Sequence, residues 1–204
     1  MVKQLAGVFF AGLLLSGCAH QPSRSMPTQD MNQGTPLAAN LSAEQRLNFT
    51  LNLIEQALLD ASSTQHYQNI EQNLLSLRRN SPSDERIYRY LIEVYTQDSR
   101  LDLAYVTAKE LINLSNATLV DQDLFASIAL SLEDYVAAER IYQDWLTQPA
   151  SHTQVAGLNN LGFSALLQQD WSRAEDYFTL ALEKDPLNQR ARHNLVLLMT
   201  LRNQ

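Results

Sequence analysis

The chain has 204 residues, a formal net charge of −7 at pH 7 and 45% hydrophobic residues. This length is enough for one domain with a substantial core. The acidic balance argues against a nucleic-acid partner and against electrostatic attachment to anionic lipid headgroups. Cys18 is the only cysteine, which excludes an intrachain disulfide. A Cys-based metal site would need further ligands that the first forty residues do not supply.

Residues 1–17 have the pattern of a secretory signal peptide. Lys3 supplies a positive charge, an unbroken run of small or apolar residues covers 5–15, and Ser16 and Gly17 precede the cysteine. As a helix this run would reach about 17 Å, which is short of the roughly 30 Å hydrocarbon core of a bilayer. We therefore expect a cleaved signal and not a permanent transmembrane helix.

The stretch Leu15-Ser16-Gly17-Cys18 resembles the lipobox of bacterial lipoproteins. The resemblance implies that Cys18 becomes the acylated first residue, because a thiolate is a suitable nucleophile for receiving the lipid. Two or three acyl chains, palmitate among them, would hold the protein firmly on a membrane. Ala19 after the cysteine implies, for this family, transport to the bacterial outer membrane with the domain facing the periplasm.

Residues 18–40 are expected to form the lipidated N-terminus and a flexible tether. The segment is rich in Pro, Gln, Ser and Asn, has no aromatic residue and shows no apolar period. From residue 41 onward Leu, Ala, Gln and Glu dominate, which predicts an all-α domain over 41–204. Pro82, Pro149 and Pro186 interrupt it at intervals close to two units and one unit of a 34-residue period.

The segment 155–188 resembles a tetratricopeptide repeat. The residues that carry this resemblance, counted from Val155, are Leu158, Leu161, Gly162, Ala165, Ala174, Phe178, Ala181 and Pro186. Gly162 and Ala174 are small where two antiparallel helices must approach closely, and Phe178 is expected to fill the space towards the next unit. Asp185 and Pro186 are expected to be the N-cap and first residue of a following helix.

Weaker copies of the pattern cover 51–84, 85–118 and 119–152, and a final helix at 189–204 is expected to cap the array. The register slips by two residues near Pro149, where we expect a longer connection beside Trp145. Possible N-cap pairs support the boundaries; they are Ser42 with Gln45, Ser81 with Asp84, Thr118 with Asp121 and Ser151 with Gln154. The resemblance implies an α-solenoid of about four helix pairs and a C-terminal capping helix, wound into a right-handed superhelix.

No catalytic or metal-binding motif is recognisable. His20, His66, His152 and His193 are scattered without metal-ligand spacing, and there is no glycine-rich phosphate loop. We therefore expect no enzyme activity, no cofactor and no small-molecule substrate. Trp145 and Trp171 are interpreted as packing residues.

Proteins with such repeats bind other proteins, and the resemblance places the binding groove on positions 2, 5 and 9 of each first helix. Those positions hold Arg86, Arg89, Glu93, Asp123, Ser127, Asn159, Phe163, Arg190 and His193. A peptide with acidic ends, or a carboxylate near Arg89 or Arg190, could be held there with Phe163 as an apolar contact. The alternative is a merely solvated face.

Residues 159–204 are similar to the C-terminal part of the TadD family, the repeat lipoproteins of tight-adherence (Flp) pilus systems. The likeness includes the segment Ala191-Arg192-His193-Asn194-Leu195. It implies a role in pilus assembly at the outer membrane, with a secretin or another pilus component as partner. The alternatives are a lipoprotein of another envelope machine, such as a type IV pilus pilotin or a β-barrel assembly component, and an envelope enzyme or small-ligand binder.

Overall fold

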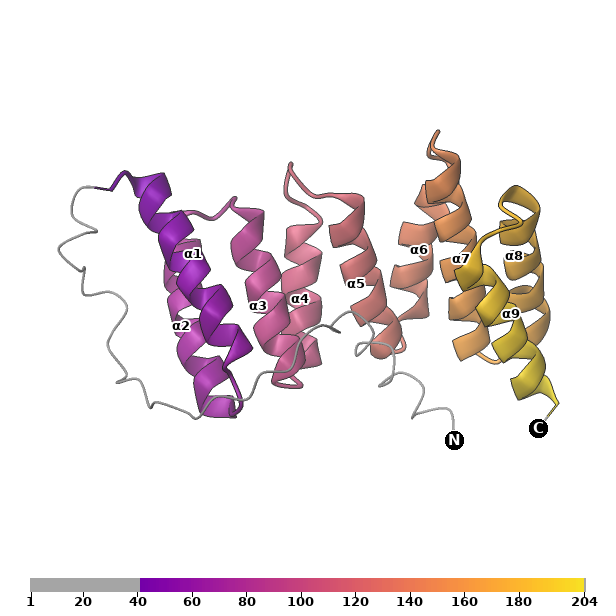
Figure 1. The fold of residues 1–204 in the computed structure, drawn as a ribbon, viewed down its shortest axis with the longest axis horizontal. Coiled ribbons are helices and arrows are strands. Elements are labelled where there is room, and N and C mark those ends of the chain that lie inside the picture. The colour runs from indigo at the N-terminus through magenta and orange to yellow at the C-terminus, as the bar shows by residue number, and fades with distance from the viewer. Residues whose placement is uncertain (1–40, 204) are drawn as a thin grey trace. The chain divides into compact units, whose positions relative to one another are not determined.

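A computed structural model describes residues 41–203 of the protein (Figure 1). The predicted signal peptide, the lipidation site Cys18 and the tether at 18–40 lie outside these residues. The described part is all-helical, as predicted, and contains no strand. Its helices are α1 (Ala43–Leu59), α2 (Thr64–Asn80), α3 (Glu85–Gln97), α4 (Leu101–Leu111), α5 (Leu119–Ser131), α6 (Tyr135–Leu146), α7 (Ser151–Leu167), α8 (Trp171–Lys184) and α9 (Gln189–Arg202).

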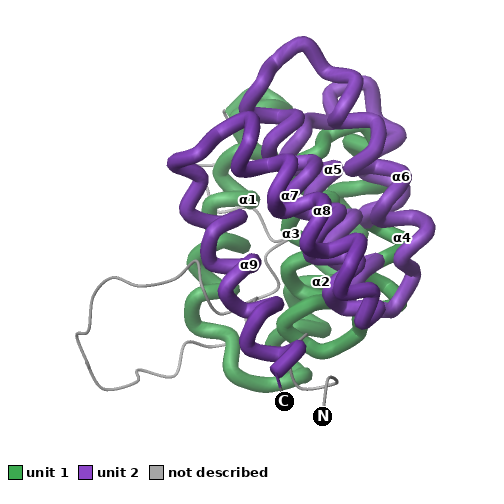
Figure 2. Tube along the Cα trace, turned by 90° about the vertical axis from the view of Figure 1, so that its right-hand side faces the viewer, with its two compact units in different colours: residues 1–107 green, residues 108–204 purple. Residues whose placement is uncertain are grey.

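The described residues divide into two compact units, 41–107 and 108–203 (Figure 2). We call them unit 1 and unit 2; the boundary falls within α4. No helix among residues 41–203 is both long and apolar enough to cross a membrane.

In unit 1, α2 packs against α1 and α3. The core side chains of α1 are Leu51, Ile54 and Leu58, whose spacing of three and four residues places them on one face of the helix. Ile70 and Leu74 of α2 are likewise four residues apart and buried. The apolar period of the sequence therefore determines which faces of these two helices form the core.

In unit 2, α7 packs against both α6 and α8, and α9 packs against α8. Two glycines of α7 permit these close approaches. A Cβ atom at Gly162 would lie 2.6 Å from the ring of Phe178 on α8, and one at Gly157 would lie 2.9 Å from the carbonyl oxygen of Tyr142 on α6. Phe178 also clusters with Leu198 of α9, so the predicted close packing at Gly162 is confirmed.

Both tryptophans occupy packing positions. Trp145 is buried, donates from Nε1 to Gln122 Oε1 at 2.7 Å, and meets the Tyr142 ring edge-on at 5.5 Å between centroids. Trp171 is half-buried against the cluster that contains Phe178. The connection at 147–150 has the same length as those at 81–84 and 185–188, so the expected longer connection is wrong. The extra residues instead lengthen α7, which begins at Ser151.

Three turns between paired helices share one backbone geometry. Within the described residues, positive φ angles at non-glycine positions occur only at Ser99, Glu133 and Gln169, with values of 59°, 61° and 60°. In each turn the next residue donates its N–H to the carbonyl five residues before it, at 2.7 to 2.9 Å, which closes the preceding helix in a Schellman arrangement. The three residues are separated by 34 and 36 positions, so the backbone itself repeats with the period seen in the sequence.

Two of the predicted capping pairs are confirmed. Ser42 and Gln45 form a reciprocal capping box at α1, and Thr118 and Asp121 form another at α5. These side chains satisfy N–H groups that the first helical turn leaves without an intrahelical partner.

The other capping predictions are wrong. Ser81 is the C-cap of α2, and Asp84 is the N-cap of α3, because its carboxylate accepts from the N–H of Arg86 at 3.1 Å. Ser151 is already helical, after an N-cap at Ala150 without a side-chain bond. Asp185 is the C-cap of α8, and its carboxylate accepts from the N–H of Leu187, so the turn continues past Pro186. Asn188 then caps α9.

Candidate partner-binding surface

The nine residues predicted to line a groove lie on α3, α5, α7 and α9 and are described unit by unit. In unit 1, α3 carries Arg86, Arg89 and Glu93. In unit 2, α5 carries Asp123 and Ser127, α7 carries Asn159 and Phe163, and α9 carries Arg190 and His193.

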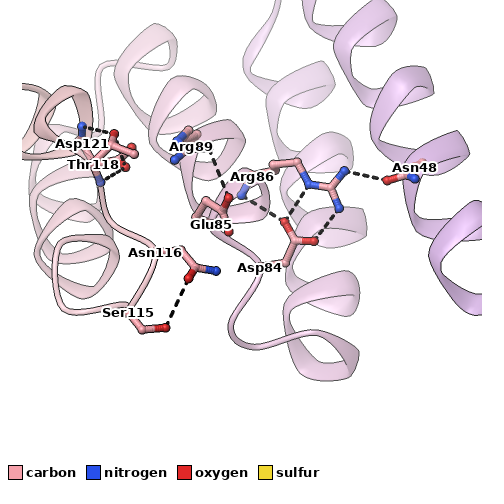
Figure 3. Close-up of polar contacts among 9 residues, drawn as sticks. All are labelled: Asn48, Asp84, Glu85, Arg86, Arg89, Ser115, Asn116, Thr118 and Asp121. Carbon is pink, nitrogen blue, oxygen red and sulfur yellow. Dashed lines mark hydrogen bonds and ion pairs between the residues drawn. The ribbon is translucent and has the colours of Figure 1, made fainter.

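Arg86 makes three side-chain hydrogen bonds within unit 1 (Figure 3). Its Nε and Nη2 atoms donate to the two carboxylate oxygens of Asp84 at 2.9 and 2.6 Å, and Nη1 donates to Asn48 Oδ1 of α1 at 2.6 Å. The hydrogen bond from Arg86 lowers the pKa of Asp84, and the carboxylate in turn raises the pKa of Arg86. Arg86 therefore joins the start of α3 to α1 and has little capacity left for a ligand.

The other two predicted residues of α3 also have partners, and a second carboxylate lies near Glu93. Arg89 lies 3.8 Å from Glu85 (Figure 3). Glu93 accepts a hydrogen bond from Gln97 at 3.1 Å. Burial raises the pKa of Glu93, and the neighbouring charge of Glu55 raises it further. Two close carboxylates disfavour an acidic ligand here.

In unit 2 a series of side-chain hydrogen bonds joins α5, α7 and α9. Asn194 Nδ2 donates to Asn159 Oδ1 at 2.9 Å, Asn159 Nδ2 to Asn160 Oδ1 at 3.1 Å, and Asn160 Nδ2 to Asp123 Oδ1 at 3.1 Å. We call Asn194, Asn159, Asn160 and Asp123 the amide ladder. Tyr142 of α6 donates to the same Asp123 oxygen at 3.1 Å. Every donor in the ladder is directed towards the carboxylate.

Burial raises the pKa of Asp123, while the Tyr142 hydrogen bond and the charge of Arg190 oppose that shift. Burial also raises the pKa of Tyr142. These directions are opposite to that of Asp84, whose pKa is lowered by its arginine. The ladder is thus a partly desolvated polar network, in which hydrogen bonds, without a contacting cation, support the carboxylate.

Several predicted groove residues have roles within the fold. Asn159 is only 6% exposed and is held in the amide ladder. Phe163 is half-buried against the Phe178 cluster, so it is not a free apolar contact. His193 is exposed on α9. The prediction missed Asn160, Asn194 and Tyr142; the only sequence signal was an asparagine directly after each of the predicted residues Asn159 and His193.

A pocket of about 340 Å³ lies between α7 and α9, and we call it the α7–α9 pocket. Its lining residues are His152, Ala156, Asn159, Asn160, Asn188, Gln189 and Arg190. A neighbouring pocket of about 320 Å³ shares His152 and Asn188 with it and includes Lys184 and Asp185. Within the described residues Arg190 makes no hydrogen bond or ion pair, although its charge acts on Asp123. This pocket therefore contains an available guanidinium.

No group of three His, Cys, Asp or Glu side chains in residues 41–203 is arranged to hold a metal ion. Comparison with protein-family models and with curated proteins gives no match to this sequence. The described part is defined by its fold, as an all-α array of helix pairs, and by the polar surface on α5, α7 and α9.

Proposed function

We propose that the protein is a non-catalytic, membrane-anchored adaptor lipoprotein built from tetratricopeptide repeats, which binds protein partners in the periplasm. The observation that carries the proposal is the recurrence of one turn geometry at Ser99, Glu133 and Gln169, close to the repeat length of that family. Helix-pair arrays of this kind generally present extended binding surfaces to other proteins. The resemblance of residues 15–18 to a lipobox supports the anchor at Cys18.

The proposed biological setting is assembly of the tight-adherence (Flp) pilus at the outer membrane. It is supported by the similarity of residues 159–204 to the TadD family. An acyl anchor, a polar tether and a protein-binding array would place a binding surface near a secretin. A role in another envelope machine is the second candidate, because the repeat pattern is shared by many such lipoproteins.

Replacing Cys18 by Ser in the native host tests both parts of the proposal. We expect the variant to lose incorporation of a palmitate analogue and to leave the outer-membrane fraction, because two or three acyl chains provide the anchorage. Surface pili and secretin oligomers should fall to the level of a deletion strain. Equal lipid labelling of the variant would contradict the anchor. Unchanged pili and oligomers in the deletion strain would contradict the pilus role and favour another envelope machine.

A further inference from the structure

We propose that the α7–α9 pocket binds a carboxylate group of a partner polypeptide, with Arg190 as the principal ligand. The inference rests on the proposed protein-binding function and specifies its chemistry. The carboxylate can belong to an Asp or Glu side chain or to the C-terminus of the partner, since the guanidinium fork matches both through two parallel hydrogen bonds.

The first argument is a difference between two equivalent arginines. Arg86 follows the N-cap of α3 by two residues, and Arg190 follows the N-cap of α9 by two residues. In α3 the N-cap is Asp84, whose carboxylate binds the guanidinium at both oxygens. In α9 the N-cap is Asn188, and its Oδ1 atom accepts from the N–H of Ala191 at 3.0 Å. A single change from carboxylate to amide at the cap therefore leaves Arg190 available.

The second argument is the unfavourable electrostatic position of Arg190. The N-terminal end of a helix carries a partial positive charge, and acidic residues are preferred there. α9 has no acidic residue in its first turn and carries Arg190 and Arg192 near its start. Arg192 is compensated by a hydrogen bond of 2.8 Å to the carbonyl oxygen of Pro186, whereas Arg190 has none among the described residues. Arg190 is exposed, and the charge of Asp123 acts on it without a direct contact, so an anionic ligand at this helix end would gain both from Arg190 and from the helix dipole.

The third argument is the space beside the guanidinium. Ala156 occupies the α7 wall, and the pocket of about 340 Å³ is at the lower end of the range for ligand sites, roughly 300–1,000 Å³. This volume suits one side chain or a polypeptide terminus. Asn159 and Asn160 in the wall are fixed by the amide ladder, and Asp123 already accepts from Tyr142 and Asn160. The wall is therefore preorganised before a ligand enters.

The net negative charge of the protein favours a polypeptide ligand over an anionic membrane. The whole protein has a net charge of −7, which repels a negatively charged bilayer, while a single carboxylate on a peptide senses mainly the local field. Asp185 lies in the neighbouring pocket together with Lys184. A ligand with one carboxylate directed at Arg190 is thus better matched than a surface with many charges.

The test is a nuclear magnetic resonance titration of the full-length protein in detergent micelles with three blocked tripeptides. The probes are acetyl-Ala-Glu-Ala-amide, acetyl-Ala-Ala-Ala with a free C-terminus, and acetyl-Ala-Gln-Ala-amide as the neutral control. We expect at least one acidic probe to give saturable shifts at the backbone amides of residues 152–160 and 188–191, and the neutral probe to give none. Which of the two acidic probes binds more tightly tells a side-chain source from a C-terminal one.

Three variants test whether the binding depends on Arg190 and on the space of the pocket. Arg190→Ala should lower the affinity for the acidic probe about tenfold to a hundredfold, which is the loss expected for hydrogen bonds to a charged group. Ala156→Leu should abolish binding by filling the pocket while Arg190 remains. Arg192→Ala, the matched control on the same helix, should change the affinity by less than about twofold. The circular-dichroism spectrum should be unchanged in all three.

Equal shifts with the neutral probe, or undiminished binding in a folded Arg190→Ala variant, would overturn the proposal. Saturable binding of inorganic phosphate or of phosphatidylglycerol vesicles without binding of either acidic peptide would also overturn it. None of these outcomes depends on the lipid labelling or on pili. Failure of the pocket and failure of the adaptor role are therefore distinguishable.

Discussion

Arg86 of unit 1 and Arg190 of unit 2 each follow a helix N-cap by two residues, but only Arg86 is held by hydrogen bonds within its unit. Asp84 caps α3 and neutralises Arg86, which also reaches Asn48. Asn188 caps α9 equally well, yet it cannot accept a guanidinium at two oxygens, and its Nδ2 atom donates to Asp185. In these two helices, the cap residue two positions before the arginine accounts for whether the guanidinium is held within the fold or remains available to a ligand.

The largest expected effect on stability concerns the packing of α8 against α7. Ala174 of α8 is fully buried next to Phe178, so Ala174→Glu would bury an unpaired charge. We expect the free energy of unfolding to fall by about 3–5 kcal/mol, measured by chemical denaturation. Glu175→Ala, at the next and exposed position, should change it by less than about 0.5 kcal/mol. A melting temperature within a degree of wild type for Ala174→Glu would contradict this packing.

Exchanging aspartate and asparagine between the two N-caps tests directly whether the cap residue controls its arginine. Asp84→Asn keeps a good N-cap but loses the ion pair, and we expect a loss of about 1 kcal/mol because Arg86 is partly exposed. Asn188→Asp gains from the helix dipole and from capture of Arg190, but it loses the hydrogen bond to Asp185 and brings two carboxylates together, so we expect a net change in stability of less than about 0.5 kcal/mol.

The second exchange has a functional readout as well. Asn188→Asp should lower the affinity for the acidic tripeptides, because the new carboxylate competes with them for the guanidinium of Arg190. Denaturation curves and the peptide titration together check both exchanges. Unaltered peptide affinity in Asn188→Asp would mean that the cap does not control the availability of Arg190.

The smallest expected effect concerns pH. The contributions of Asp84 and Asp123 to the free energy of unfolding should change in opposite directions as the pH falls. The folded-state pKa of Asp84 is lowered, so its stabilising contribution is present above the ordinary aspartate value and is lost as the pH falls through the folded pKa. The pKa of Asp123 is raised, so its contribution improves as the pH falls through the folded pKa towards the ordinary value.

Unfolding measured between pH 7 and pH 3 should therefore separate two variants. The deficit of Asp84→Asn relative to wild type should shrink at the acidic end of this range. Asp123→Asn should match or exceed wild type at pH 7, and that advantage should shrink at lower pH. The same direction of change for both variants would break the distinction between a paired and a desolvated carboxylate.

The helices were predictable because their apolar residues recur with helical spacing, and because Thr118 and Asp121 form the expected capping box. The N-cap of α3 was not, because Ser81 and Asp84 both have cap-forming side chains and only the path of the backbone through Pro82 decides between them. The hydrogen-bonding state of the predicted groove residues could not be read from the sequence. Whether Arg86 is paired depends on three simultaneous hydrogen bonds, one of them to Asn48 of α1, and no periodicity encodes such a bond.

The repeated turns at Ser99, Glu133 and Gln169 have a consequence for how such a protein evolves. All three residues are exposed, and backbone hydrogen bonds, not their side groups, form each joint. A serine, a glutamate and a glutamine all occupy this position, so the joint does not require one particular side chain. Duplication or loss of a helix pair between two such joints would leave the flanking connections intact, and an array of this kind can change in length without inventing a new turn.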